Sequence, residues 1–157
     1  MHPALSAIAM LLPAVLSAQT ASYTYVDQKA PYKNQGVPLL KAVTLPRIGQ
    51  TFTLEVPDSG MNCCPFYMNG LLATGARPMN MRFDALGGFL YASPDVVLPT
   101  PQGSPSSVIS RTKMSFQIPN SPQLLGVRFY QQVLQTARNQ FWSVTYLSRG
   151  GIGVIGR

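Results

Sequence analysis

Two adjacent cysteines, Cys63 and Cys64, are the only cysteines in the chain and the residues best suited to covalent chemistry. In an oxidising compartment such a pair has three outcomes: a strained vicinal disulfide, bonds to other subunits, or burial as small apolar side chains. A vicinal bond would stiffen the turn between Gly60 and Pro65. Two thiolates without a histidine or further cysteines fall short of a closed tetrahedral metal site. We therefore expect no metal and no cofactor, and Cys63 and Cys64 are a disulfide candidate.

Two short motifs match the residue spacing of known functional sites, but the surrounding sequence lacks other features that those sites require. Gly151 to Gly156 spell G-x-G-x-x-G, but a dinucleotide site needs a following helix and an acidic residue about 20 residues further on. Ser110 and Lys113 have the S-x-x-K spacing of penicillin-recognising enzymes, which requires a helix to bring both side chains onto one face. In a strand these two positions face opposite sides. We expect a glycine-rich final strand and a solvated strand edge instead.

The other ionisable and aromatic residues form no recognisable active site. The only histidine is His2, and no two of the five acidic residues have the spacing of a glycosidase pair or a calcium site. Trp142 and the seven tyrosines could supply a platform for stacking sugars, but most of them lie in alternating stretches that favour burial. We therefore predict no catalytic residues.

Residues 1–18 have the features of a secretory signal peptide. An uncharged apolar run, Ala4 to Leu16, is shorter than the about 20 residues of a membrane-spanning helix and ends in a small-residue cleavage pattern. A buried N-terminal helix is the alternative, but Pro3 and Pro13 disfavour it. We expect cleavage after Ala18, which leaves one domain, 19–157, that is not an integral membrane protein and is secreted or held at the cell surface.

The chain is basic but sparsely charged. Twelve Lys and Arg against five Asp and Glu give a formal net charge of +7, although only 11% of the residues are charged. Proteins that bind nucleic acids or anionic surfaces usually cluster their cations, whereas these cations are spread along the whole sequence. We expect no nucleic-acid partner and only a weak attraction to acidic polysaccharide.

Apolar residues in the remaining sequence recur at every second position, which predicts strands with one buried face. In Gln50–Val56 that face comprises Phe52, Leu54 and Val56. Two further segments alternate in the same way: Lys113–Ile118 with Met114, Phe116 and Ile118, and Phe141–Leu147 with Trp142, Val144 and Tyr146. Other strands are expected at Ser22–Val26, Pro38–Thr44, Pro65–Ala73, Phe89–Ser93, Gly126–Leu134 and Ile152–Ile155.

About nine short strands separated by Gly, Pro and Asn turns predict an all-β fold, and specifically an antiparallel β-sandwich. One segment, Gln123–Ala137, also has a helical stripe of apolar residues, but Gly126 and the alternation in VRFYQQV favour a strand. Pro99–Ser107 has the composition of a long surface loop.

Four stretches carry a family resemblance: Pro46–Val56 (PRIGQTFTLEV), Phe89–Asp95 (FLYASPD), Ile118–Gln132 (IPNSPQLLGVRFYQQ) and Leu147–Arg157 (LSRGGIGVIGR). Through them the sequence resembles a family of exported bacterial domains of unknown function, usually found as C-terminal modules of surface repeat proteins. The resemblance implies an all-β sandwich and transfers no catalytic residues. This chain departs from the family pattern in placing Cys63 and Cys64 together and in standing without an upstream repeat region.

These observations favour a protein that presents a surface over one that catalyses a reaction. We expect a non-catalytic structural or adhesive protein of the bacterial envelope or of an extracellular assembly. Its partners would be copies of itself or other envelope proteins, with polysaccharide as a further candidate. The alternative is a carbohydrate-binding module that uses exposed aromatic rings.

Overall fold

A computed structural model describes residues 19–26, 40–57, 67–83, 88–101, 111–138, 141 and 143–157. The expected signal peptide (1–18), Cys63 and Cys64, and Trp142 lie outside these described residues, as do the side chains of Val144 and Tyr146. The predictions made for them therefore stay predictions.

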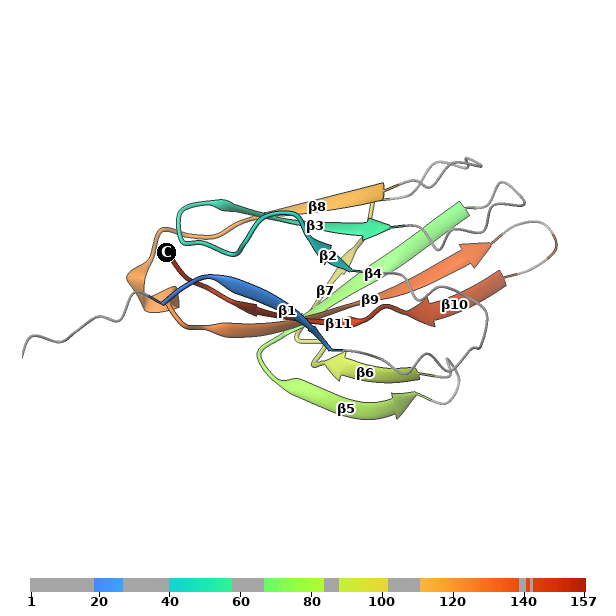
Figure 1. The fold of residues 1–157 in the computed structure, drawn as a ribbon. Coiled ribbons are helices and arrows are strands. Elements are labelled where there is room, and N and C mark those ends of the chain that lie inside the picture. The colour runs from blue at the N-terminus through green and yellow to red at the C-terminus, as the bar shows by residue number, and fades with distance from the viewer. Residues whose placement is uncertain are drawn as a thin grey trace, which may run out of the picture.

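The described chain is all-β and its sheets are antiparallel, as the alternating sequence predicts (Figure 1). One short 3-10 helix, η2 (Pro122–Leu124), interrupts the strands. The strands of the described ranges are β1 (Ser22–Val26), β2 (Lys41–Ala42), β3 (Thr51–Pro57), β4 (Tyr67–Gly75), β5 (Pro78–Phe83), β6 (Gly88–Ala92), β7 (Val96–Pro99), β8 (Arg111–Gln117), β9 (Arg128–Arg138), β10 (Ser143–Leu147) and β11 (Gly150–Val154).

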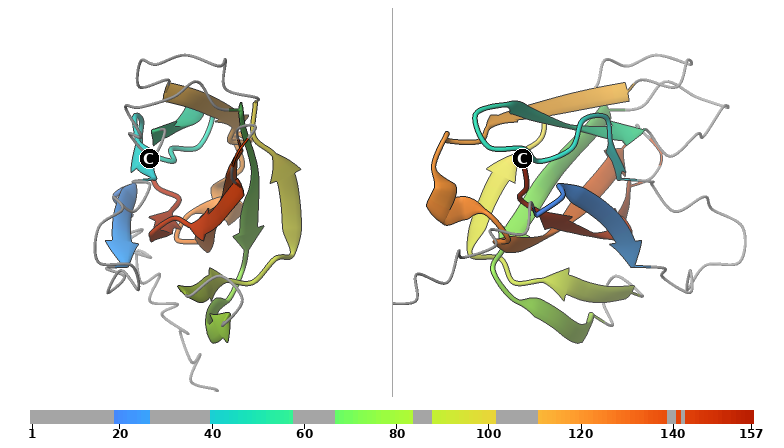
Figure 2. Two further views of the ribbon diagram at one scale, coloured as in Figure 1. Left: turned by 90° about the vertical axis from the view of Figure 1, so that its right-hand side faces the viewer. Right: turned by 60° about the vertical axis from the view of Figure 1, so that its left-hand side comes forward.

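The strands form three sheets. The largest has six strands in the order β1-β11-β9-β4-β7, with β10 also pairing with β9. A three-stranded sheet has the order β2-β3-β8, and β5 and β6 form a separate hairpin. The six-stranded sheet lies between the three-stranded sheet and the hairpin (Figure 2). Strand β9 is thus covered on both faces.

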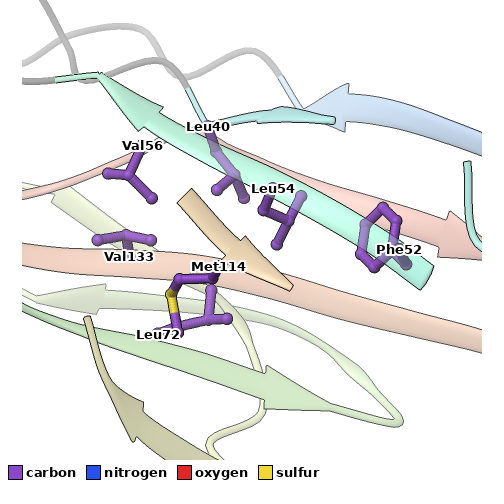
Figure 3. Packing of buried hydrophobic residues seen from close by; sticks show 7 residues of the cluster. All are labelled: Leu40, Phe52, Leu54, Val56, Leu72, Met114 and Val133. Atoms are coloured by element: carbon purple, nitrogen blue, oxygen red, sulfur yellow. The ribbon is translucent and has the colours of Figure 1, made fainter. Parts of the chain in front are cut away.

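The main hydrophobic core fills the space between the three-stranded and the six-stranded sheet (Figure 3). Phe52, Leu54 and Val56 of β3 are each at most 2% exposed, which confirms the buried face predicted for this strand. Leu72 of β4 and Val133 of β9 meet them from the opposite sheet and are completely buried. Burial of such side chains contributes about 1.5–3 kcal/mol each to stability, so this layer holds the two sheets together.

The structure adds two strands, β5 and β7, to the predicted ones, and of the strand expected at Pro38–Thr44 it shows Lys41–Ala42 (β2) within the described ranges. Strands β5 and β7 were not predicted, because Pro78 opens β5, and Pro94 and Pro99 bracket the short β7, so that both segments resemble turns. The segment 123–137 forms strand β9 preceded by η2, so the strand interpretation is confirmed over its helical alternative.

Strand β9 has polar side chains on both of its buried faces, and they hold the layers in place. Gln132 is fully buried and faces the hairpin, where its Nε2 donates to the carbonyl oxygens of Phe89 and Ser148, both at 2.9 Å. Its Oε1 accepts a hydrogen bond from the backbone N–H of Tyr91 at 2.8 Å. Every hydrogen-bonding atom of this amide therefore has a partner, which burial of a polar group requires.

Gln131 points toward the other sheet. Its Oε1 accepts from the Tyr23 hydroxyl and its Nε2 donates to Thr74 Oγ1, both at 3.2 Å. Burial, and then the neighbouring Tyr25, raise the pKa of Tyr23 far above its ordinary value, so the hydroxyl remains a protonated donor. This bond ties β1 to β9 across the glycines of β11.

Strands β10 and β11 continue one another along β9, with one extra residue between them. Leu147 pairs with Leu134, whereas Gly151 pairs with Gln131, so the junction is a β-bulge. Ser148 fills it: its N–H donates to the Val133 carbonyl at 2.7 Å, and its Oγ accepts from the Val133 N–H at 2.8 Å. Because of the extra residue, the side chains after the bulge lie on the opposite face of the sheet from the one that unbroken alternation would give.

The glycines of β11 lie beneath aromatic rings. A Cβ at Gly151 would overlap the Tyr23 hydroxyl, and a Cβ at Gly153 would overlap the ring of Phe129. Glycine is therefore required here by close packing of its neighbours, which is the usual reason for glycine inside a strand. The prediction of a glycine-rich final strand is confirmed.

The two ends of the described chain meet beside β11. The N–H of Arg157 donates to the carbonyl oxygen of Gln19 at 3.1 Å, and Gly156 packs against the backbone of Ala21. Gly156 also forms a bridge with Arg47 that runs parallel. The first and last described segments thus close one end of the fold.

We expect Gly153→Ala to lower the free energy of unfolding by about 1–3 kcal/mol, because the new methyl group collides with the Phe129 ring. In a Phe129→Ala background the same substitution should have almost no further effect, because the obstacle is gone. Urea denaturation of the four proteins in this double-mutant cycle measures the coupling. Additive effects of the two substitutions would contradict the packing described for β11.

Candidate functional site

The described residues contain no group of three or more His, Cys, Asp or Glu that could hold a metal ion. Among these residues, no helix has the length and apolar character needed to cross a membrane. The S-x-x-K motif falls partly outside the described ranges, and its Lys113 lies in the extended strand β8. The features that remain as candidates for function are surfaces and sheet edges.

Several aromatic side chains of the described ranges pack against one another. Tyr23, Phe52 and Phe129 form one cluster, with ring centroids 5.5 to 6.4 Å apart. Tyr25 is 40% exposed, but its ring lies at 68° to that of Tyr23. Phe141 is 81% exposed and stands apart from this cluster in the sequence. Phe89 and Tyr91 of β6 form a separate pair, with ring centroids 6.2 Å apart and ring planes at 36°.

The two carboxylates of the described ranges both sit beside partners. Register places Glu55 of β3 between Lys41 of β2 and Lys113 of β8. Glu55 is nonetheless only 7% exposed, although the alternation predicted the polar side of its strand. The neighbouring lysines on both sides explain how a carboxylate is accommodated there, because a buried charge requires compensating partners.

Asp95 holds two turns together at the edge of the six-stranded sheet. Its Oδ2 accepts from the Ala76 N–H at 2.8 Å and from the Ser93 hydroxyl at 3.0 Å, and Ser93 Oγ accepts from the Arg77 N–H at 3.2 Å. The hydrogen bonds from Ala76 and Ser93 hold the pKa of Asp95 below its ordinary value. This arrangement gives Ser93 and Asp95 of FLYASPD a structural role.

The described part of the chain carries the whole positive excess. It includes ten of the twelve basic residues but only two of the five acidic ones. Eight of these basic side chains are exposed, and they lie on several elements: Lys41, Arg47, Arg77, Arg82, Lys113, Arg128, Arg138 and Arg157. The scattered charge favours a weak, general attraction to anionic surfaces over a compact anion site.

The outer face of the three-stranded sheet, opposite the core, is polar and internally hydrogen-bonded. Thr53 and Ser115 hydroxyls lie 3.0 Å apart across β3 and β8, and the Thr51 hydroxyl donates to Gln117 Oε1 at 3.0 Å. Thr44 Oγ1 accepts from the Thr53 N–H at 2.7 Å on the other side of β3. We call Thr44, Thr51, Thr53, Ser115 and Gln117 the polar face.

Strand β8 forms the outer edge of this sheet (Figure 1). It pairs with β3 over seven residues in unbroken register and contains no proline. The Ile118 N–H donates to the Gln50 carbonyl at 3.0 Å, and backbone direction alternates along an antiparallel strand. The backbone groups of Lys113, Ser115 and Gln117 therefore point away from β3. We call these outward groups the β8 edge; no strand of the described ranges pairs with it.

Two of the other sheet edges, those of β7 and β2, are blocked. On β7, the bond from the Thr100 N–H to the Gly70 carbonyl at 2.8 Å sets the alternation, so that Val97 and Pro99 face outward. Pro99 has no N–H, and a proline at this position is a common protection of edge strands. On β2, the outward N–H of Ala42 donates to the Tyr25 hydroxyl at 2.9 Å. Compared with these, β8 is open.

Comparisons with protein-family models, with curated proteins and with solved structures give no match to this chain. The resemblance carried by the four sequence stretches therefore remains a prediction.

Sequence reasoning identified the buried face of β8 but not its position at an edge. Edge position depends on the order of strands in the sheet, which periodicity does not encode. One signal was available: prolines at Pro78, Pro94 and Pro99 mark segments near other edges, whereas the sequence from Arg111 to Gln117 has none.

We expect Asp95→Asn to destabilise the protein more at pH 7 than at pH 3. The pKa of this carboxyl is lowered in the folded state, so its contribution is present above the unfolded value of about 3.9 and is lost as the pH falls through the folded value. Thermal unfolding of wild type and Asp95→Asn between pH 3 and pH 7 tests this expected pH dependence. A difference that stays constant with pH would show that the Asp95 charge has no part in holding the two turns together.

Proposed function

We propose that this chain is an exported, non-catalytic β-sandwich that acts as a structural or adhesive protein of the bacterial envelope or of an extracellular assembly. The observation that carries the proposal is the β8 edge beside the polar face: an open, regular strand that can take another strand by backbone pairing. The two larger sheets with their shared core support the sandwich.

Charge supports the same proposal. Exposed cations spread over several elements, with both described carboxylates already beside partners, give the surface a broad positive potential. Such a surface is weakly attracted to anionic envelope polymers without needing a specific pocket. Cell-surface attachment and self-association are therefore compatible functions of one molecule.

The carbohydrate-binding module is the second candidate. Its support comes from the exposed rings of Phe141, Tyr25 and Phe89, and from the pair that Phe89 forms with Tyr91 on β6, with ring planes at 36°. Recognition of a sugar by stacking would need two or more of these rings to present parallel faces. The packing of the remaining described rings favours the structural role.

Export and the fate of Cys63 and Cys64 belong to the proposal and are tested together. We expect the protein secreted by a bacterial host to have lost residues 1–18 and to be two hydrogens lighter than its dithiol form. Intact mass measured without reductant, before and after thiol alkylation, checks both. A mass that retains residues 1–18 would contradict export, and immediate alkylation of both thiols would contradict the vicinal disulfide.

The function itself is tested by co-sedimentation of the exported protein with isolated envelopes of the producing bacterium. We expect a saturable fraction in the pellet that exceeds that of a basic control protein of similar net charge. Parallel titration with soluble neutral and acidic oligosaccharides tests the alternative, because a sugar-binding module would bind them in isolation. Absence of envelope binding, or hydrolysis of an envelope polymer, would contradict the proposed function.

A further inference from the structure

We propose that two copies of this chain associate through the β8 edge, β8 against β8, so that two three-stranded sheets join into one continuous six-stranded sheet. This inference rests on the proposed function, because it names the partner and the contact through which the protein would assemble. The occupant of the edge is a second copy of the chain.

The first argument is the state of the backbone. Lys113, Ser115 and Gln117 direct their N–H and C=O groups outward, and these three residues are exposed. A regular edge strand with such groups is a template for strand pairing unless the protein protects it. Within the described ranges, β7 has Pro99, β5 has an irregular register after Pro78, and the outward Ala42 N–H of β2 is bonded to Tyr25.

The second argument is the incomplete burial of the β8 side chains that face the core. Phe52 and Leu54 of β3 are at most 1% exposed. Met114 of β8 is 8% exposed, and Phe116 of β8 and Ile118, which directly follows the strand, are only partly buried although they pack on the same core. Because β8 is an edge strand, part of their apolar surface stays uncovered. A further strand beside β8 would cover it, which removes apolar surface from water.

The third argument is that a like-charge pair and a proline exclude two of the three possible registers. If two β8 strands pair antiparallel about a twofold axis at Ser115, then Ser115 faces its own copy and Lys113 faces Gln117 of the other copy. An axis at Lys113 would instead place two lysines directly opposite each other, which is destabilising. An axis at Gln117 would bring Pro119, which has no N–H, opposite Ser115.

The Ser115 register also satisfies the backbone. Residues 113, 115 and 117 are all outward-facing, so each of the three pairs can exchange two N–H···O bonds. On the core side, Met114 faces Phe116 of the other copy, which continues the apolar layer from one sheet to the next. On the outer side, the polar face continues across the junction, because Thr53 and Ser115 of each copy lie in one row.

Sedimentation equilibrium of the exported protein at about 0.1 mM tests the proposal, because a dimer with Kd below about 10 μM is mostly formed at that concentration. We expect a dimer for wild type and for Ser115→Ala, and a monomer for Ser115→Pro. The proline removes an outward N–H that is not used in pairing with β3, so the thermal midpoint of Ser115→Pro should stay close to that of Ser115→Ala. A monomeric wild type, or a dimeric Ser115→Pro, would overturn the proposal.

Cross-linking gives an independent check if Ser115→Pro fails to fold. In a background with Cys63 and Cys64 both changed to Ser, Ser115→Cys should form a covalent dimer on mild oxidation, because residues facing each other in a hydrogen-bonded pair have Cα atoms about 5.5 Å apart. Gln117→Cys is the matched control, since its two copies would lie about 14 Å apart along the strands. Equal cross-linking of both variants, or of neither, would overturn the register.

The outcomes separate this inference from the proposed function. Envelope binding by a monomer, or by a dimer that Ser115→Pro leaves intact, would overturn β8 pairing and leave the proposed function standing. A monomer that binds no envelope would contradict both. Dimer formation that Ser115→Pro abolishes, without envelope binding, would support β8 pairing and contradict only the envelope role.

Discussion

The fold depends on the burial of strand β9 on both of its faces. On one side Val133 belongs to the core shared with the three-stranded sheet, and on the other Gln132 binds the backbone of the hairpin. Pairing of polar groups matters on a strand in that position, because each unpaired buried group costs about 1–3 kcal/mol. The glutamine amide, with two donors and an acceptor used at once, satisfies this condition for three segments that are distant in sequence. The layers are thus joined by directed bonds as well as by apolar contact.

The sequence predicts those parts of this fold that depend on local alternation. The bounds of β1 agree with the predicted Ser22–Val26, and the buried residues of β3 and β8 agree with their period of two. Strands β5 and β7 were missed because prolines at their ends resemble turn residues. The burial of Glu55 was missed for another reason: it depends on Lys41 and Lys113, which reach it only through strand register. Local pattern carries no information about such pairing partners.

The candidate site shows the same division between local and long-range information. The sequence indicates that Lys113, Ser115 and Gln117 lie on the solvent side of a strand, yet their role depends on what lies beside that strand. The glycines of the closing sequence illustrate the converse case. Their G-x-G-x-x-G letters are those of a phosphate-binding loop, but Gly151 and Gly153 are needed because Tyr23 and Phe129 lie across the strand. Here the same spacing of glycines is explained by close packing against aromatic rings.

The meeting of Gln19 with Arg157 beside β11 has a consequence for how the domain could be tethered. Any polypeptide joined before residue 19 and any joined after residue 157 would leave from the same pole of the molecule. Such a domain could be inserted into a loop of a host protein with little disturbance, because entry and exit points are adjacent. In a tandem array with short linkers, each copy would be attached at the same end. The sheets of neighbouring copies could then contact one another side by side.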